Sequence, residues 1–132
     1  MRISLLREIA SVALLVAVGF ALLALLTFHP EDPGWSLAAS QRIENAGGPV
    51  GAYLADVLLA FLGLAAYVLV AGVAIQGLRQ LHGRWGAARA LGRWGGFAGV
   101  LAGAAGLLHL LPLAVPAWLG ETGPGGILGH LL

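Results

Sequence analysis

The sequence predicts an all-α membrane protein with three transmembrane helices, the N-terminus inside the cell and the C-terminus outside. Of its 132 residues, 59% are hydrophobic and only 10% are charged, whereas soluble domains contain roughly 25% charged residues. The hydrophobic residues gather in three long stretches, and most arginines lie before the first stretch or between the second and the third. Because short loops rich in arginine stay on the cytoplasmic side of a membrane, their distribution predicts the orientation.

The first apolar stretch, residues 9–28, is long enough to cross a bilayer once. At about 1.5 Å per residue, such a helix covers a hydrocarbon core of roughly 30 Å. Its basic start resembles a secretory signal, but signals have apolar cores of about 7–15 residues followed by a small-x-small cleavage site. Residues 25–30, LLTFHP, offer no such site. We therefore expect an uncleaved membrane anchor.

The other two stretches complete a single membrane domain over residues 1–132. The second, residues 50–75, follows a Gly-Gly-Pro run, in which proline suits the first turn of a helix and the glycines allow a sharp turn before it. The third, residues 94–113, stops near two prolines. The connecting segments are expected outside at 29–49, inside at 76–93 and outside at 114–132.

The predicted inner loop carries four arginines: Arg79, Arg84, Arg89 and Arg93. Arg2 and Arg7 precede the first stretch, and the predicted outer tail has no basic residue. Each arginine at a helix centre carries an apparent insertion penalty of roughly 2.5–3.5 kcal/mol. Moving this loop across the membrane is therefore much less favourable than moving the acidic outer segments.

Aromatic residues give an independent check, because Trp and Tyr favour the two membrane–water interfaces. The residues at the predicted inner interface are Trp85 and Trp94, and those at the outer one are Phe28, Trp35, Tyr53 and Trp118. Tyr67 is the exception, since it lies deep in the second stretch. We expect its hydroxyl to bond to a helix carbonyl or another neighbour.

Small residues form two parallel ladders along the third stretch: Gly95, Gly99 and Gly103, and beside them Ala98, Ala102 and Gly106. Small-xxx-small spacing lets the backbones of spanning helices approach closely, so we expect this helix to pack against protein. A weaker ladder on the first stretch, Ala13, Ala17 and Ala21, is a candidate partner face. Glycine and alanine are also frequent in spanning helices generally, and the spacing does not separate packing within one protomer from packing between protomers.

Few polar residues enter the spans. Asp56 lies about two turns into the second stretch, either as a proton or ion site or as an interfacial acid that fixes helix depth or bonds to a neighbouring helix. His29 and His109 lack acidic or thiol company and make a poor metal-ligand set. Glu31 and Asp32 are expected to form an exposed acidic turn between two prolines.

No soluble catalytic signature is present. The sequence lacks G-x-x-x-x-G-K-[ST], H-E-x-x-H, G-x-S-x-G and C-x-x-C, and the Gly-rich run at 120–126 has no lysine for a phosphate. With no cysteine and a net charge of +1, nothing favours thiolate chemistry or a nucleic-acid surface. We expect no catalytic residue, no metal, no cofactor and no direct nucleic-acid contact by this segment.

Two ordered motifs carry a family resemblance. Residues 28–36, FHPEDPGWS, and residues 45–56, NAGGPVGAYLAD, resemble the D-P-x-W-S turn and the N-x-G-G-x-x-G-A-x-x-A-D segment in the N-terminal membrane domain of the FtsK/SpoIIIE DNA translocases. Residues 63–67 and 125–129 are also similar, so the likeness covers essentially the whole chain. The matching motif residues are Asp32, Pro33, Trp35, Ser36, Asn45, Gly47, Gly48, Gly51, Ala52 and Asp56.

The resemblance implies a non-catalytic anchor in the bacterial inner membrane at the division septum. Family members have four spanning helices, a cytoplasmic linker and a hexameric ATPase that moves double-stranded DNA during chromosome segregation. The chain is expected to be truncated before the fourth helix, so ATP and DNA binding belong to the complete protein. The expected partners are the lipid bilayer and other septal proteins. The outer segment, with a short amphipathic turn at 37–44, and the tail would contact those proteins, and self-association stays open.

A small proton-coupled transporter that uses Asp56 is the alternative function. Small multidrug transporters have a similar size, but their acid lies in the first span. Here the first span has no ionisable residue between Glu8 and His29. An Asp56→Asn variant distinguishes the two, because proton-coupled flux in vesicles would be lost only if the chain is a transporter.

Overall fold

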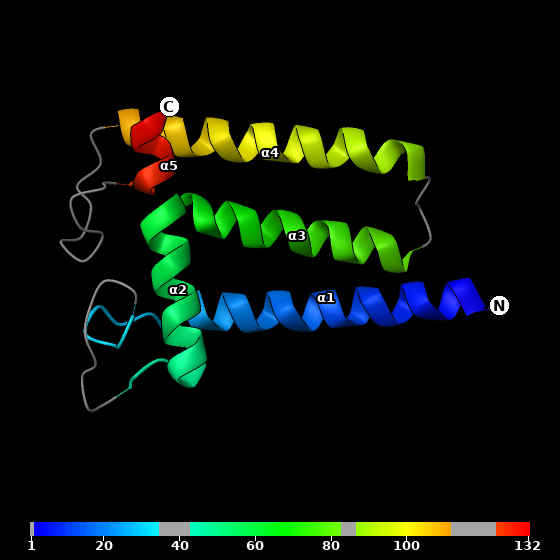
Figure 1. Cartoon of the computed structure of the whole chain (residues 1–132), viewed down its shortest axis with the longest axis horizontal. Coiled ribbons are helices and arrows are strands. Elements are labelled where there is room, and N and C mark those ends of the chain that lie inside the picture. The colour runs from blue at the N-terminus through cyan, green and yellow to red at the C-terminus, as the bar shows by residue number, and fades with distance from the viewer. Residues whose placement is uncertain (1, 35–42, 83–86, 112–123) are drawn as a thin grey trace.

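The computed structural model describes residues 2–34, 43–82, 87–111 and 124–132, and within these ranges all regular structure is helical. The helices, labelled in Figure 1, are α1 (Arg2–Leu26), α2 (Gly48–Leu62), α3 (Ala65–Leu81), α4 (Ala87–Leu110) and α5 (Gly126–Leu131). The predicted all-α class is therefore confirmed for the part of the chain that the structure describes.

Three helices form a layer, which we call the three-helix layer. Helix α3 lies between α1 and α4 and contacts both (Figure 1). We call the end where α1 ends and α3 begins the junction end, and the opposite end, where α1 begins, the basic end. Helix α2 runs across the layer at the junction end, where it contacts α1, α3 and α5. The short helix α5 also contacts α4 there.

The second apolar stretch does not form the single helix that we predicted over residues 50–75. It divides into α2 and α3, which are bent by 110° at the break after Leu62. Gly63 ends α2 with a φ of 55°, a left-handed conformation that glycine adopts without a Cβ clash. Apolar composition predicts burial in lipid or protein, but it does not reveal a bend made by one glycine within the stretch.

Length and apolarity identify one clear membrane span in the described residues. The segment Glu8–Leu26 of α1 has a mean hydropathy of 2.8. The bent pair of α2 and α3 meets the same criteria only when both helices are taken together as one span. Helix α4 has 24 residues, but its many glycines add little apolar character. The three-span prediction is thus supported for one span, or two with the bent pair.

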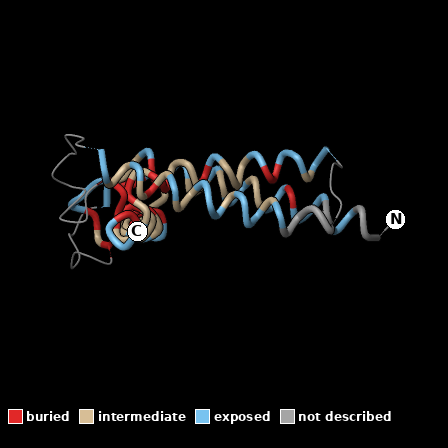
Figure 2. The backbone as a smooth tube through the Cα atoms, turned by 90° about the horizontal axis from the view of Figure 1, so that it is seen from above, coloured by how far each residue is buried: buried red, intermediate tan, exposed pale blue. Residues whose placement is uncertain are grey.

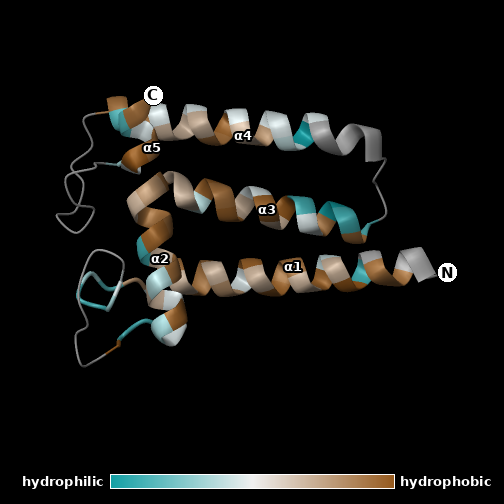
Figure 3. Ribbon diagram, viewed as in Figure 1, coloured by the Kyte–Doolittle hydropathy of each residue, from teal (hydrophilic) through white to brown (hydrophobic). Residues whose placement is uncertain are grey.

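The buried core lies at the junction end, where α1, α2 and α3 meet (Figure 2). Its buried members are Ala24, Leu25, Ala55, Leu59, Ala66 and Val70. Away from this end, α1 is hydrophobic along much of its length (Figure 3), and many of its apolar residues are exposed. Leu6 is 67% exposed and Val16 is 68% exposed. A helix whose outward face is apolar suits a membrane, because lipid tails solvate apolar side chains.

Candidate functional site

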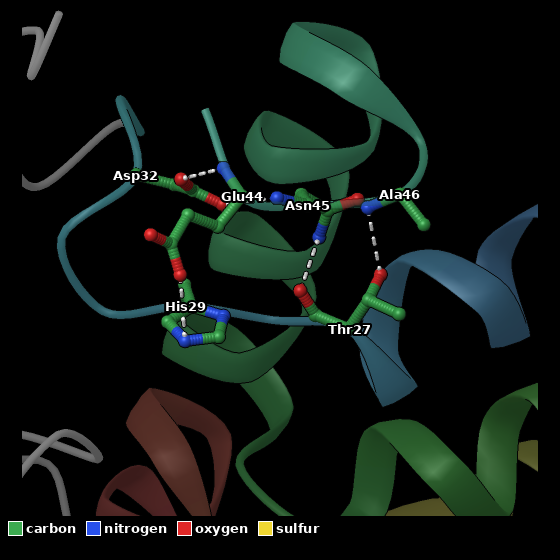
Figure 4. Close-up of polar contacts among 6 residues, drawn as sticks. All are labelled: Thr27, His29, Asp32, Glu44, Asn45 and Ala46. Atoms are coloured by element: carbon green, nitrogen blue, oxygen red, sulfur yellow. Dashed lines mark hydrogen bonds and ion pairs between the residues drawn. The ribbon is translucent and has the colours of Figure 1, made fainter. Parts of the chain in front are cut away.

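The segment between α1 and α2 holds half of the described motif residues, and the first turns of α2 hold the other half. We call residues 27–34 and 43–47 the connector, which is shown in Figure 4. Asp32 is only 6% exposed. Its Oδ1 accepts a hydrogen bond from the backbone N–H of Glu44 at 2.7 Å, and its Oδ2 accepts one from the N–H of Asn45 at 2.9 Å. The carboxylate of Asp32 therefore links the two parts of the connector, residues 27–34 and residues 43–47, by hydrogen bonds.

Asn45 fastens the connector to the end of α1. Its side chain is nearly buried, with 4% of the residue exposed. The Nδ2 group donates to the carbonyls of Ala24 at 2.8 Å and Thr27 at 3.2 Å. Ala24 lies in the last turn of α1 and Thr27 directly follows the helix, where a helix leaves carbonyls without intrahelical partners. The Oδ1 atom accepts from the N–H of Gly47 at 2.8 Å, so one amide serves both helix ends.

Two further contacts complete the connector. The Thr27 hydroxyl donates to the Leu23 carbonyl at 2.7 Å and accepts from the N–H of Ala46 at 3.1 Å. His29 Nε2 lies 3.2 Å from a carboxylate oxygen of Glu44, and both side chains are about half exposed. Exposed ion pairs contribute roughly 0–1 kcal/mol. The buried bonds of Asp32 and Asn45 therefore hold the connector more strongly than this pair does.

The glycines of the second motif leave room for these polar groups. A Cβ on Gly51 would lie 2.5 Å from the Asn45 Oδ1, and one on Gly47 would lie 2.9 Å from the Gly51 Cα. Gly48 has a φ of 63°, which suits glycine at the start of α2. Ala52 is buried within α2. The spacing in N-x-G-G-x-x-G-A thus corresponds to an asparagine packed onto a small-residue face.

Asp56 and Gly34 join the connector to the middle of α2. Asp56 is half-buried, and a Cβ on Gly34 would lie 2.5 Å from its Oδ2. The structure therefore brings Asp32, Pro33, Gly34, Asn45 and Asp56 into one region. Trp35, Ser36 and most of the expected amphipathic turn at 37–44 lie outside the described residues.

The expectation that Glu31 and Asp32 both form an exposed turn is wrong for Asp32. Glu31 is exposed, whereas Asp32 is buried. The reason is the pair of backbone N–H groups that its carboxylate accepts, because hydrogen bonds to the ionised form offset the cost of removing it from water. The sequence places its partners twelve and thirteen residues away, so local pattern alone could not show them.

A second close contact lies at the break between α2 and α3. The N–H of Leu64 donates to the carbonyl of Pro124 at 2.9 Å, and a Cβ on Gly63 would lie 2.7 Å from the nitrogen of Gly126. Gly126 has a φ of 61°. The start of α5 therefore packs directly on the bend, and Pro124, just before α5, accepts a hydrogen bond from the backbone of the bend. Non-helical backbone at membrane depth needs such protein partners, because lipid offers none.

The glycine ladder of α4 does not pack within the described protomer. Gly95, Gly99 and Gly103 are exposed, and nothing lies within 4 Å of a Cβ built on any of them. Ala98 is exposed too. Helix α4 instead contacts α3 through Phe97, whose ring occupies the space of a Gly72 Cβ.

The second ladder turns partly toward α5. Ala102 and Gly106 line a groove of about 410 Å³ between α4 and α5, and a Cβ on Gly106 would lie 3.8 Å from Leu132. Ala105, a residue that our sequence analysis did not select, is fully buried there against Gly125 and Gly129. The four-residue spacing of Gly125 and Gly129 is a small-xxx-small signal that could have indicated this contact. Whether the open ladder meets another copy stays a prediction.

The first ladder is not a partner face for α4 in the described structure. Ala13 and Ala17 are exposed, and Ala21 packs against the core at the junction end. Helix α1 contacts α3 rather than α4 along the layer. One contact of this pair is the Tyr67 hydroxyl, which donates to the Leu25 carbonyl at 3.1 Å. The expectation that Tyr67 bonds to a helix carbonyl is confirmed.

The described arginines gather at the basic end of the layer (Figure 1). Arg79 is in the last turn of α3, and Arg89 and Arg93 are in the first two turns of α4. Arg2 and Arg7 lie at the start of α1. Arg84 lies outside the described residues. The connector and the arginines are thus at opposite ends of the layer.

The histidines have separate neighbours. His29 pairs with Glu44, whereas the rings of His109 and His130 meet edge to face with centroids 5.4 Å apart. The Nδ1 atom of His109 is buried with no hydrogen-bond partner among the described residues. The described part of the chain contains no group of three or more residues that would suit a metal ion.

These features define a class of protein: a helical membrane region whose connecting backbone is closed by buried hydrogen bonds at one end and flanked by arginines at the other. A family model for the 4TM region of DNA translocase FtsK/SpoIIIE matches residues 4–132. The chain belongs to this family.

Relatives agree with the family match. The chain is 37% identical over 135 residues to DNA translocase FtsK 2 of Ralstonia nicotianae, covering 90% of this chain and 17% of the relative. It is 36% identical over 135 residues to DNA translocase FtsK of Pseudomonas syringae pv. syringae, covering 96% of this chain and 16% of the relative. The chain therefore spans less than a fifth of the length of these relatives. No solved structure matches it.

Proposed function

We propose that this chain is the membrane anchor of a DNA translocase that acts in cell division and chromosome segregation at the septum of a bacterial inner membrane. The observation that carries the proposal is the match of residues 4–132 to the 4TM region of this family. The relatives are named DNA translocases, and the chain corresponds to only a small part of their length. We assign DNA movement and ATP hydrolysis to other parts of such a protein and no catalysis to these residues.

The anchor works through its two different ends. The arginines hold the basic end in the cytoplasm, since arginine-rich loops resist transfer across the membrane. At the other end, Asp32, Asn45 and Thr27 satisfy the backbone of the connector. We infer that this end lies on the outer side, where the connector and its neighbouring segments contact other septal membrane proteins.

The position of Asp56 favours an anchor over a transporter. Asp56 lies on α2 directly against Gly34 of the connector. It is thus at the junction end rather than along a path between the two ends of the layer. An Asp56→Asn variant should therefore change no proton flux in vesicles.

Localisation tests the proposal. A fluorescent protein fused to the N-terminus of the chain should gather at the division site of growing cells. As a control, the same fusion carrying Asp32→Asn and Asn45→Ala together should reach the membrane less efficiently, because the connector loses its buried bonds. Uniform membrane fluorescence from the intact fusion in dividing cells would contradict the septal part of the proposal.

A further inference from the structure

Helix α2 has an apolar face that the described part of the chain covers only in part, with Val57 half-buried and Val50, Tyr53 and Phe61 exposed. Its buried residues, Gly51, Ala52, Ala55 and Leu59, lie on one side. Val50, Tyr53, Val57 and Phe61 are spaced three or four residues apart, so at about 100° per residue they share the opposite side. Val50 is 69% exposed and Phe61 is 50% exposed.

The direction of α2 distinguishes it from the other long helices. The 110° bend at Gly63 turns α2 roughly perpendicular to α3, and Figure 1 shows it crossing the layer instead of running along it. If α3 runs along the membrane normal, α2 lies close to the plane of the membrane. In that orientation α2, the first helix of the bent pair, does not cross the membrane.

The depth of α2 follows from its contacts with α1. Gly47 lies against Phe20, and Gly51 lies against Ala24. Both α1 residues belong to the last two turns of the segment Glu8–Leu26, the clearest span in the described chain. Two turns of helix correspond to about 11 Å, which is comparable to the 5–10 Å by which in-plane helices enter the headgroup–acyl boundary.

The distribution of polar and apolar side chains around α2 suits a helix at the headgroup–acyl boundary. Asp56, the one charged residue of the helix, lies against the connector, and Tyr53 is of a type enriched at membrane interfaces. Leu58 is two residues from Asp56 and therefore points about 160° away from it around the helix axis, where it packs against the core. One edge of α2 is thus polar, and the opposite edge is apolar.

We infer that α2 lies in the plane of the membrane surface and that its outward face, formed by Val50, Tyr53, Val57 and Phe61, binds the headgroup–acyl boundary of the lipid. Lipid is the partner because α2 packs directly on α1, whose candidate span exposes apolar side chains such as Val16 and Leu26. The inference adds a lipid-binding surface to the proposed anchor and depends on α1 crossing the bilayer. Its test must therefore measure both helices in the same sample.

Spin labels at single cysteines measure the depth of each position, and the chain has no native cysteine to interfere. Nitroxides are placed one at a time at Val50, Val57 and Phe61, and depth is read from collisions with oxygen and with a water-soluble nickel chelate. The chain is reconstituted in vesicles of phosphatidylethanolamine and phosphatidylglycerol. Val16 and Leu26 on α1 form the control pair, since both are equally exposed and lie ten residues apart.

The two pairs should behave differently. At about 1.5 Å per residue, the Val16 and Leu26 labels should differ in depth by about 15 Å, whereas the Val50 and Phe61 labels should lie within a few Å of each other. All three α2 labels should collide with oxygen more than with nickel. A depth that increases by about 16 Å from Val50 to Phe61, with the control pair as expected, would overturn the in-plane helix but leave the anchor intact.

Other outcomes overturn the inference for different reasons. Nickel collisions that dominate at all three α2 positions would place this face in water. Labels that neither reagent reaches would show that protein, such as a second copy, covers the face. If the Val16 and Leu26 labels showed no difference in depth, the proposed anchor itself would fail.

Discussion

The glycines at the junction end and the glycines of α4 have similar spacing but opposite surroundings. Gly47 and Gly51 are four residues apart, as are Gly125 and Gly129, and all four are crowded by side-chain or backbone atoms, whereas Gly95, Gly99 and Gly103 have no atom within 4 Å of the position of a Cβ. The first set holds the protomer together, and the second leaves a smooth helix face open. Small-residue spacing therefore indicates a surface capable of close approach, but the fold decides whether that approach occurs within the chain.

The largest effect should come from Gly63→Ala. A non-glycine residue in the left-handed region costs about 1–2 kcal/mol, and crowding against Pro124 and Gly126 adds about 1–3 kcal/mol. We expect a loss of about 3 kcal/mol in the free energy of unfolding, measured by chemical denaturation in mixed micelles.

Gly48→Ala is the matched control for this change. Gly48 also has a positive φ, but nothing lies within 4 Å of its Cβ position. This variant should lose only the conformational part, about 1–2 kcal/mol. Equal losses for the two variants would contradict the close packing of Pro124 and Gly126 on Gly63.

Asp32→Asn should have the next largest effect. An amide has one acceptor oxygen and would turn an N–H group toward one of the two backbone donors that the carboxylate now binds. Bonds to charged groups contribute about 1.5–3 kcal/mol, so we expect a loss within that range by the same denaturation measurement. Glu44→Gln, which affects only the exposed pair with His29, should lose less than about 1 kcal/mol. The connector would be misassigned if Glu44→Gln were the more harmful change.

The smallest effect on protomer stability should come from Gly99→Ala. Alanine is favoured over glycine in a helix interior by about 1 kcal/mol, and the added methyl meets nothing, so stability should stay constant or rise slightly. Gly72→Ala on α3 should destabilise the protomer, since the Phe97 ring must move. A marked loss of stability on Gly99→Ala would contradict the open face.

Disulfide crosslinking of a Gly99→Cys variant in membranes is a separate test of whether this face contacts a second copy of the chain.

Much of this architecture could be predicted from the sequence, because its signals are local. The apolar run of α1 and the clustering of Arg79, Arg89 and Arg93 follow directly from composition. The motif residues Asp32, Asn45 and Gly51 could be selected by resemblance, but not their roles. The carboxylate of Asp32 meets backbone groups from a segment brought back by the fold.

The bend at Gly63 and the contact of α5 with it could not be predicted in the same way. Gly63 lies within an apolar run that has the length and composition of one span. What distinguishes it is the backbone of Pro124 and Gly126, about sixty residues further along the chain. Such a contact depends on tertiary packing and leaves no periodic signal near Gly63.

A membrane anchor of this design requires the connector and the arginines to lie on opposite faces of the bilayer. Labelling with a membrane-impermeant maleimide tests this in cells whose outer membrane is permeabilised while the cells otherwise stay intact, with the inner membrane sealed, using Ala46→Cys in the connector and His82→Cys at the basic end, both at exposed positions. We predict that Ala46→Cys is labelled in intact cells and that His82→Cys is labelled only after lysis. Labelling of His82→Cys in intact cells would contradict the proposed orientation, and labelling of both positions would contradict a membrane-crossing anchor.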